Sequence, residues 1–424
     1  MTRLRLAADN TFRSLHTRNF RLFFVGQLVS QAGTWMEAVA VTWVVLQLTD
    51  SGIALGLVTA ARFGPLLVLG PWGGVLSDRI DRQRLMLAMQ VCFAALATLM
   101  MVLVVTDVAN VAVLYGLSIA FGVLMALDSP ARRALVTELV PRDDVANAVG
   151  LNSAIMTGAR VIGPAVAGVL IAGPGVEWCF VANSLSYLVI IGSLLRLDRS
   201  QLRATPLVPK AKGQLREGFR YVRRTPELAV PLAFMAVVGT LAFNFQVTLP
   251  LLAERSLDGS ASTFTWIYAT MSLGSVAGAL AVARQTTMRA GFLVAAGTGM
   301  TVAMTALALA PSVPLALLAS LPTGFTSIFI ISGTNAVVQL ESAPEMRGRV
   351  LAMTSMVFLG STPIGGPLVG WVSQVVDPRA GLLVGSIATG LATAWVAHRH
   401  RHPRTTTPET LEAPTPLQTT TAAA

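Results

Sequence analysis

The chain has 424 residues, of which 54% are hydrophobic and only 12% charged, and its mean hydropathy is +0.65. One soluble core of this length cannot bury so much apolar surface, so the composition excludes an ordinary water-soluble globular protein. The net charge of +10 would suit nucleic acid. The distribution of the basic residues along the chain argues against that partner, because they alternate with long apolar stretches.

Apolar stretches long enough to cross a membrane recur along the chain. A helix needs roughly 20 residues to cross about 30 Å of hydrocarbon. We therefore predict an all-helical membrane protein with twelve transmembrane helices. Six are predicted over residues 21–47, 54–77, 85–105, 110–130, 149–173 and 177–195. Six more are predicted over residues 227–252, 262–283, 290–309, 313–339, 349–375 and 380–398.

A long basic segment separates the sixth predicted span from the seventh. It divides the chain into a cytoplasmic N-terminal segment (1–20), two six-helix halves, a linker and a C-terminal tail. The two halves are 21–195 and 227–398, the linker is 196–226, and the tail is 399–424. The tail is rich in Thr, Pro and Ala, a composition typical of disorder.

The basic residues predict the orientation of the chain in the membrane. Most of the 31 Lys and Arg residues fall in the two terminal segments, the linker and the loops on one side of the predicted spans. By the positive-inside rule, that side is cytoplasmic. We expect a multi-pass protein of the plasma (inner) membrane with both termini in the cytoplasm.

The two halves contain an internal repeat. The segment that begins the fifth span matches the segment that begins the eleventh at one common spacing. The matched pairs are Pro141 with Pro344, Gly163 with Gly366, and Pro164 with Pro367. A duplication of this kind predicts two halves related by an axis along the membrane normal, with a central cavity at their interface.

The loop between the second and third spans reads GVLSDRIDRQR, residues 74–84. Together with the two groups of six spans, it resembles the major facilitator superfamily, whose loop motif is matched by Gly74, Leu76, Asp78, Arg79 and Arg82. The segments GTWMEAVAVTWVVLQLTDSGIALGLV, DSPARRALVTELVPRDDVANAVGLNSA and GARVIGPAVAGVLIAG resemble its drug–proton antiporter branch, which includes enterobactin-exporter-like proteins.

The resemblance implies a secondary active transporter that exports a small amphipathic molecule by alternating access, coupled to proton antiport. Its partners would be that small-molecule substrate, protons and the lipid bilayer, and it would act as a monomer. An uptake transporter, or a non-transporting membrane sensor or scaffold of the same fold, stays as an alternative. The identity of the substrate is beyond the sequence.

The resemblance places a gate on the cytoplasmic side. Its residues would be Gly74, Asp78, Arg79 and Arg82 in the loop, with Asp128 and Arg132 at the end of the fourth span. An anion at Asp78 can bind the N–H groups of a helix start, or an Arg, when that side is closed. Alternatively, the charges only anchor the loop in water. We call such a closing contact of Asp78 the latch. The corresponding loop after the eighth span, VARQTTMRA, has no acidic residue, so we expect the latch in the first half alone.

Glycine and proline in the fifth span, GARVIGPAVAG, predict a hinge. Gly158, Gly163 and Gly168 permit close helix packing, and Pro164 removes a backbone hydrogen bond. Gly366 and Pro367 would form the mirrored hinge in the second half. The motif resembles one associated with exporters in this superfamily, and ordinary packing of small residues is the alternative.

Four ionisable residues lie inside predicted spans: Glu37, Arg62, Asp128 and Arg160. Each costs about 2.5–3.5 kcal/mol at a helix centre, so each needs a partner or a task. Glu37 and Arg62 lie at similar depth, which predicts a pair, whereas Arg160 could instead hold Glu37 or an anionic substrate. No span contains a His in its interior, so Glu37, Arg62 and Arg160 are the candidates for proton coupling. A structural Glu–Arg pair that never titrates is the alternative.

The superfamily arrangement implies a cavity lined by the first, fourth, seventh and tenth spans. Its candidate lining residues are Gln27, Gln31, Trp35, Asn244 and Gln246, with helix packing as the alternative role for most of them. The sequence has no GxxxxGK[ST] phosphate loop, Ser/His/Asp arrangement or HExxH motif. We therefore expect no enzyme activity, no cofactor, no metal site and no nucleic-acid partner.

Overall fold

The structure is a computed structural model that describes residues 12–77, 80–203, 214–283 and 291–401. Its first group of long helices is α2 (Arg18–Thr49), α3 (Gly52–Ser77), α4 (Arg82–Val105), α5 (Val111–Glu138), α6 (Val145–Ala172) and α7 (Glu177–Leu195). The short helix α8 (Gln214–Arg224) follows. The second group is α9 (Pro226–Leu241), α10 (Phe245–Leu251), α11 (Ala261–Ala283), α12 (Gly291–Ala308), α13 (Val313–Glu341), α14 (Pro344–Val375) and α15 (Pro378–Arg401).

Within the described residues, ten helices are long and apolar enough to cross a membrane. Residues 226–256, which include α9 and α10, count as one of these spans. The ten coincide with ten of the predicted spans. The first and eleventh predicted spans coincide with α2 and α14, which are 32 residues long each but are not among the ten.

Local sequence sets several helix boundaries. Asp81 caps α4 by accepting a hydrogen bond from Arg84 N at 2.7 Å, and Asn110 caps α5 by accepting one from Val113 N at 3.0 Å. The expectation that the fourth span ends near residue 130 is wrong, because α5 continues through Pro130 to Glu138. Neighbouring helices can hold the backbone that an interior proline leaves unpaired.

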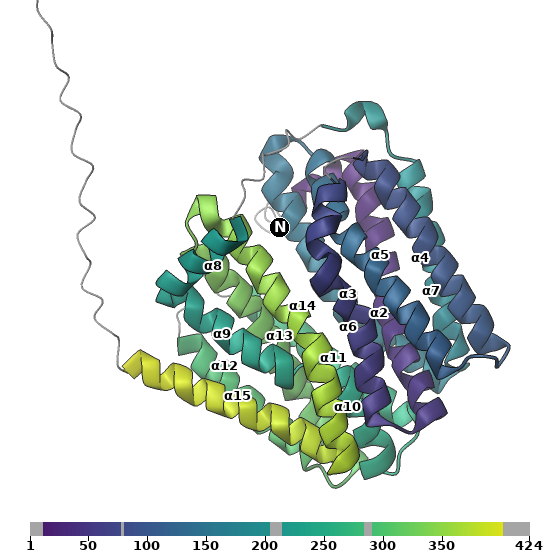
Figure 1. The fold of residues 1–424 in the computed structure, drawn as a ribbon, viewed down its shortest axis with the longest axis vertical. Helices are drawn as coiled ribbons and strands as arrows, with labels where there is room; N and C mark the ends of the chain where they lie inside the picture. Colours follow the sequence, from purple (N-terminus) through teal and green to yellow (C-terminus); the bar gives the residue numbers. More distant parts are fainter. Residues whose placement is uncertain (1–11, 78–79, 204–213, 284–290, 402–424) are drawn as a thin grey trace, which may run out of the picture.

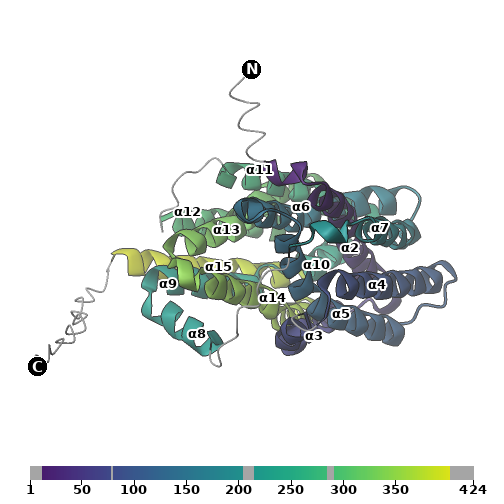
Figure 2. The ribbon, with the colours of Figure 1, turned by 90° about the horizontal axis from the view of Figure 1, so that it is seen from above.

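Helices α2–α7 pack together on one side of the molecule and α9–α15 on the other (Figure 1). The most extensive contacts between the groups are those of α3 with α14 and of α6 with α11, and α10 also packs against α2 and α3. Figure 2 shows the α3–α14 and α6–α11 pairs at opposite edges of the molecule. Helices α6 and α14 carry the matched Gly-Pro pairs of the repeat, so equivalent helices of the two groups form equivalent contacts.

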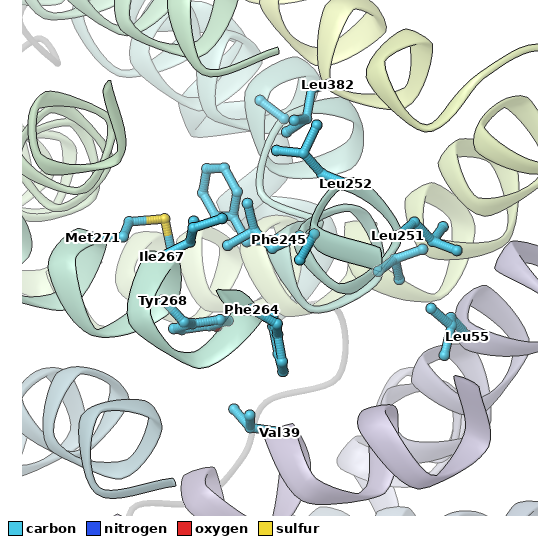
Figure 3. Packing of buried hydrophobic residues seen from close by; sticks show 14 of the residues in the cluster. Val39, Leu55, Phe245, Leu251, Leu252, Phe264, Ile267, Tyr268, Met271 and Leu382 are labelled. Carbon is cyan, nitrogen blue, oxygen red and sulfur yellow. The ribbon is translucent and has the colours of Figure 1, made fainter. Parts of the chain in front are cut away.

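The groups converge at the end that carries α10 and diverge toward the end that carries α8 (Figure 1). The largest buried hydrophobic cluster extends across the junction at the converging end. In Figure 3, Val39 of α2 and Leu55 of α3 face Phe264 and Leu251 of the second group. The two groups therefore share one apolar core there.

Candidate functional site

A cavity lies between the two helix groups at mid-depth. Its empty volume is ≈ 870 Å³, counting the part that opens to solvent. The first group contributes residues of α2, α3 and α6, and the second contributes the α9–α10 junction, α11, α13 and α14. Both groups therefore contact anything bound there.

The seventh predicted span is interrupted where it lines the cavity. Helix α9 ends at Leu241 and α10 begins at Phe245. Asn244 stabilises the break, because its Nδ2 donates to Thr240 O at 2.7 Å. Pro250 also removes the helical hydrogen bond that the carbonyl of Gln246 would accept. The break turns Asn244 and Gln246, with the neighbouring Phe243 and Phe245, toward the cavity.

Two amide atoms at this break have no hydrogen-bond partner among the described residues. They are Asn244 Oδ1 and Gln246 Nε2, both buried and both on residues that line the cavity. A buried polar atom without a partner is costly. The wall of the cavity therefore offers one acceptor and one donor to a ligand.

Arg160 of α6 lies in the cavity between aromatic rings from the two groups. Its Cζ is 4.7 Å from the ring centre of Trp35 on α2 and 4.6 Å from that of Phe358 on α14. Among the described residues, Arg160 has no carboxylate within 4.0 Å. The predicted alternative that Arg160 holds Glu37 is therefore wrong.

Glu37 instead pairs with Arg62, as the sequence predicts. Arg62 Nη1 lies 3.4 Å from Glu37 Oε1, and Asn183 Nδ2 donates to Glu37 Oε2. Arg62 also donates to Thr34 O at 3.3 Å and lies over the Phe121 ring at 3.8 Å. Glu37 and Arg62 are only 2% and 5% exposed, so the ion pair is buried inside the first group.

Asp128 and Arg132 form a second buried cluster. Arg132 Nη2 lies 3.2 Å from Asp128 Oδ2, one helical turn away, and Gln90 Nε2 of α4 donates to Asp128 Oδ1 at 2.9 Å. The sequence places Asp128 for contact with a helix end or an Arg, and the contact found is the one with Arg132. Both partners of Asp128 come from the first group.

A family model described as transmembrane secretion effector matches residues 9–420 of the chain. The chain belongs to this family, a branch of the major facilitator superfamily. Superfamily members are transporters, and the resemblance found in the sequence is confirmed.

Three characterised relatives are similar over much of the chain. A staphyloferrin A transporter of Staphylococcus aureus is 24% identical over 60% of this chain, and the match spans 64% of that relative's length, just under two thirds. The multidrug efflux pump Tap of Mycolicibacterium fortuitum is 28% identical over 86% of this chain and 92% of its own. An enterobactin exporter of Escherichia coli K12 is 25% identical over 92% of this chain and 94% of its own.

Solved structures confirm the major facilitator fold. A bacterial homologue of the human lysosomal transporter Spinster, in an inward-facing and unoccupied conformation, superposes with a TM-score of 0.71. It covers 91% of this chain and 96% of its own, at 15% sequence identity. At that identity the likeness shows the fold alone.

Part of the superfamily loop motif can be placed. Arg82 forms an ion pair with Glu138 at the end of α5, a partner that the sequence analysis missed. Gln83, where many superfamily members have Lys, donates to Leu194 O at 2.7 Å and so ties α4 to α7. Gly74 falls within α3. Asp78 and Arg79 lie outside the described residues, as does most of the corresponding loop after α11.

The glycines of the fifth-span motif have unequal surroundings. A Cβ on Gly163 would lie 2.6 Å from Trp35 Cβ, and one on Gly168 would lie 3.1 Å from Thr265 O of the second group. Among the described residues, no atom lies within 4 Å of a Cβ on Gly158. The expected close packing therefore occurs at Gly163 and Gly168 but not at Gly158. Pro164 is buried within a continuous α6.

The mirrored pair, Gly366 and Pro367, lies against α3. A Cβ on Gly56 of α3 would be 2.5 Å from Gly366 O and 2.6 Å from Pro367 Cα. A Cβ on Gly370, one turn further along α14, would clash with Gly52 O. These glycines therefore bring the two helix groups into backbone contact.

The predicted lining of the cavity is correct only in part. Trp35, Asn244 and Gln246 line it, but Gln27 and Gln31 do not. On α2 the cavity extends only as far as Trp35, and Gln27 is fully buried two turns away. No described residue of α5, the predicted fourth lining span, reaches the cavity. Helix α5 packs against α3, which does line the cavity.

Proposed function

We propose that this superfamily member is a secondary active exporter of small amphipathic molecules, working by alternating access with proton antiport. The observation that carries the proposal is the cavity at the junction of the two groups, where Arg160 and aromatic rings meet. A cavity walled by both groups is exposed alternately to the two sides when the groups rock against each other. The names of the relatives place siderophores and drugs among the substrate classes to test.

The proposal includes the topology of the chain. Helices α2 and α14 would cross the membrane with the ten apolar spans, giving twelve spans in two halves, 21–195 and 227–398, joined by the basic linker 196–226. Both termini, 1–20 and 399–424, would be cytoplasmic in the plasma membrane, and the protein would act as a monomer. The positive-inside rule supports this orientation.

In that orientation the closed end of the molecule is the outer one. Arg255 pairs with Asp50 across the two groups at 2.9 Å, and Gly52 N donates to Gln374 Oε1 at 2.7 Å. The described state then corresponds to a cavity closed to the outside. A substrate would enter from the cytoplasm and leave after this end opens.

We assign proton coupling to the Glu37–Arg62 pair. A proton taken up by Glu37 would remove the charge that faces Arg62, whose other contacts among the described residues are Thr34 O and the Phe121 ring. Buried ion pairs are strongly destabilised when one partner loses its charge. Protonation would therefore change the packing of α2 against α3, which both contribute to the cavity.

We assign the inner gate to Gly74, Asp78, Arg79, Arg82, Asp128 and Arg132. The Arg82–Glu138 pair supports this assignment, because it fixes the start of α4 to the end of α5. Asp128 and Arg132 lie one turn or more before that end. A latch at Asp78 would act through the α4–α5 hairpin, which the Arg82–Glu138 pair holds together.

The purified full chain in proteoliposomes tests the proposal. Vesicles with an imposed pH gradient are loaded with enterobactin or ethidium, and movement of each compound and of protons is followed together. We expect movement that depends on the gradient, with counterflow of protons. Lack of movement of any compound in either direction would favour the alternative, a membrane sensor or scaffold. Net movement in the same direction as protons would favour an uptake transporter.

A further inference from the structure

The cavity has a single kind of charge on its wall. Among the described residues that line it, Arg160 is a cation, and there is no Asp, Glu, Lys or His. The remaining lining consists of aromatic rings, such as Phe63, Phe243 and Tyr268, with aliphatic side chains, a methionine, and hydroxyl and amide groups. A positively charged ligand would find no counterion there and would meet the like charge of Arg160.

Arg160 is half-buried and, unlike three other arginines of the first helix group, has no anion among the described residues. Arg62 is paired with Glu37, Arg82 with Glu138 and Arg132 with Asp128. Among the described residues, the Arg160 guanidinium lies over two rings and donates no hydrogen bond, and Tyr268 interacts with it electrostatically. Away from water, an unpaired cation is expensive. Its guanidinium N–H groups are therefore available to an anion that enters the cavity.

A second, independent group at the same cavity also lacks an acceptor. Gln246 Nε2 is buried, lines the cavity from the α9–α10 break and has no hydrogen-bond partner among the described residues. It belongs to the second helix group, whereas Arg160 belongs to the first. Residues with free donors therefore line the same cavity from both groups.

We propose that the transported molecule is an amphipathic organic anion, with a carboxylate or phenolate that binds Arg160 and an aromatic or apolar body that packs against the rings. This inference rests on the proposed function and adds the charge class of its substrate. The rings of Trp35 and Phe358 hold the guanidinium between the two groups and accept no ordinary hydrogen bond from it. A bound anion therefore adds to these contacts and stabilises the state in which both groups meet around it.

The test uses three fluorescent probes that share one ring system and differ in charge. They are pyrenebutyrate, an anion; pyrenebutyramide, which is neutral; and pyrenemethylammonium, a cation. Binding to the purified full chain in detergent is measured by fluorescence titration at neutral pH. A hydrogen bond to a charged group predicts that the anion binds about 10- to 100-fold more tightly than the amide, and the cation more weakly than the amide.

Variants assign this preference to one side chain. Arg160→Gln should lose about 10- to 100-fold in affinity for the anion while its affinity for the amide changes little. Arg160→Lys keeps the charge and should keep the order anion above amide, which provides a second measurement if Arg160→Gln does not fold. Arg223→Gln changes the net charge by the same amount at an exposed position of α8 and should bind all three probes like the wild type.

Two results would overturn the inference. One is equal affinity of the wild type for pyrenebutyrate and pyrenebutyramide. The other is an unchanged preference for the anion in Arg160→Gln. The vesicle experiment separates this inference from the proposed function. Selective binding of the anion without transport contradicts the exporter and leaves the anion site standing. Transport of ethidium by a protein with no preference for the anion supports the exporter and contradicts the anion site.

Discussion

The contact between α3 and α14 predicts that one added methyl group opens the closed end of the molecule. In Gly56→Ala, the new Cβ would lie 2.5 Å from Gly366 O and 2.6 Å from Pro367 Cα. Ordinary contact begins near 3.4 Å, so the two helices must separate by about 0.9 Å. Both nearest atoms are backbone atoms, which cannot rotate away as a side chain would.

The magnitude follows from the cost of overpacking. Extra methyl groups in a well-packed interior cost about 1–3 kcal/mol. Because this contact joins the two groups, the cost falls on the state in which they are closed at this end. The equilibrium should therefore shift about 5- to 150-fold toward the state that is open there.

Spin labels can measure this shift as a distance. Val108 and Val376 are 58% and 70% exposed and lie at the closed end, one in each group. Both are changed to Cys and labelled in a background without Cys92 and Cys179, the two native cysteines. Double electron–electron resonance should then show a longer distance in Gly56→Ala than in the wild type.

Gly64→Ala on the same helix is the matched control. Among the described residues, no atom lies within 4 Å of a Cβ at this position. This variant should retain the wild-type distance distribution. If Gly56→Ala also retains it, α3 and α14 do not form the closing contact, and the reasoning from glycine packing is wrong.

Three further substitutions test the charged groups. Glu37→Gln leaves Arg62 without its carboxylate, so we expect a loss of about 3–5 kcal/mol in unfolding free energy and transport that no longer varies with pH; a wild-type pH profile would exclude Glu37 as the proton carrier. Asp50→Asn removes the pair with Arg255, but the Asp50 side chain is 75% exposed. Its effect on the spin-label distances should therefore correspond to less than about 1 kcal/mol. An effect larger than that of Gly56→Ala would contradict the expectation that this exposed ion pair contributes less to closure than the glycine contact does. Asp78→Asn should insert normally and transport more slowly, and an unchanged rate would exclude a latch at that residue.

The sequence predicts well where the helices lie along the chain, but it predicts poorly which helices and helix faces pack against each other. Helix positions follow from the length of apolar stretches, and the Glu37–Arg62 pair follows from equal depth on consecutive spans. The rings around Arg160 could not be predicted, because Trp35 and Phe358 come from opposite ends of the chain. Lipid tails and neighbouring helices are both apolar, so no stripe of polar residues marks which face of a span points inward. This is why the expectation for the fourth span is wrong, whereas the first, seventh and tenth spans do line the cavity.

The roles of Asn183 and Asn244 are indicated by the sequence. Asn183 is a polar residue inside an apolar stretch, where such a residue needs a partner, and it donates to Glu37. Asn244 lies shortly before Pro250, a pattern that favours a break in a helix. Glu138 could not have been predicted, because it lies beyond the expected end of its span, and only the continuation of α5 brings it to Arg82.

The ionisable residues are distributed unequally between the two helix groups. All four ionisable residues inside the predicted spans belong to the first group, whereas the interiors of the second group's spans contain no Asp, Glu, Lys, Arg or His. The second group supplies rings, hydroxyls and amides to the cavity, together with the glycine face against α3. A change of charge on Glu37 can therefore influence the second group only through packing. Two such routes are present, the Arg160–Phe358 contact at the cavity and the α3–α14 backbone contact at the closed end. Since Arg62 lies on α3 close to that second contact, a proton on Glu37 and an added methyl on Gly56 should act on the same equilibrium.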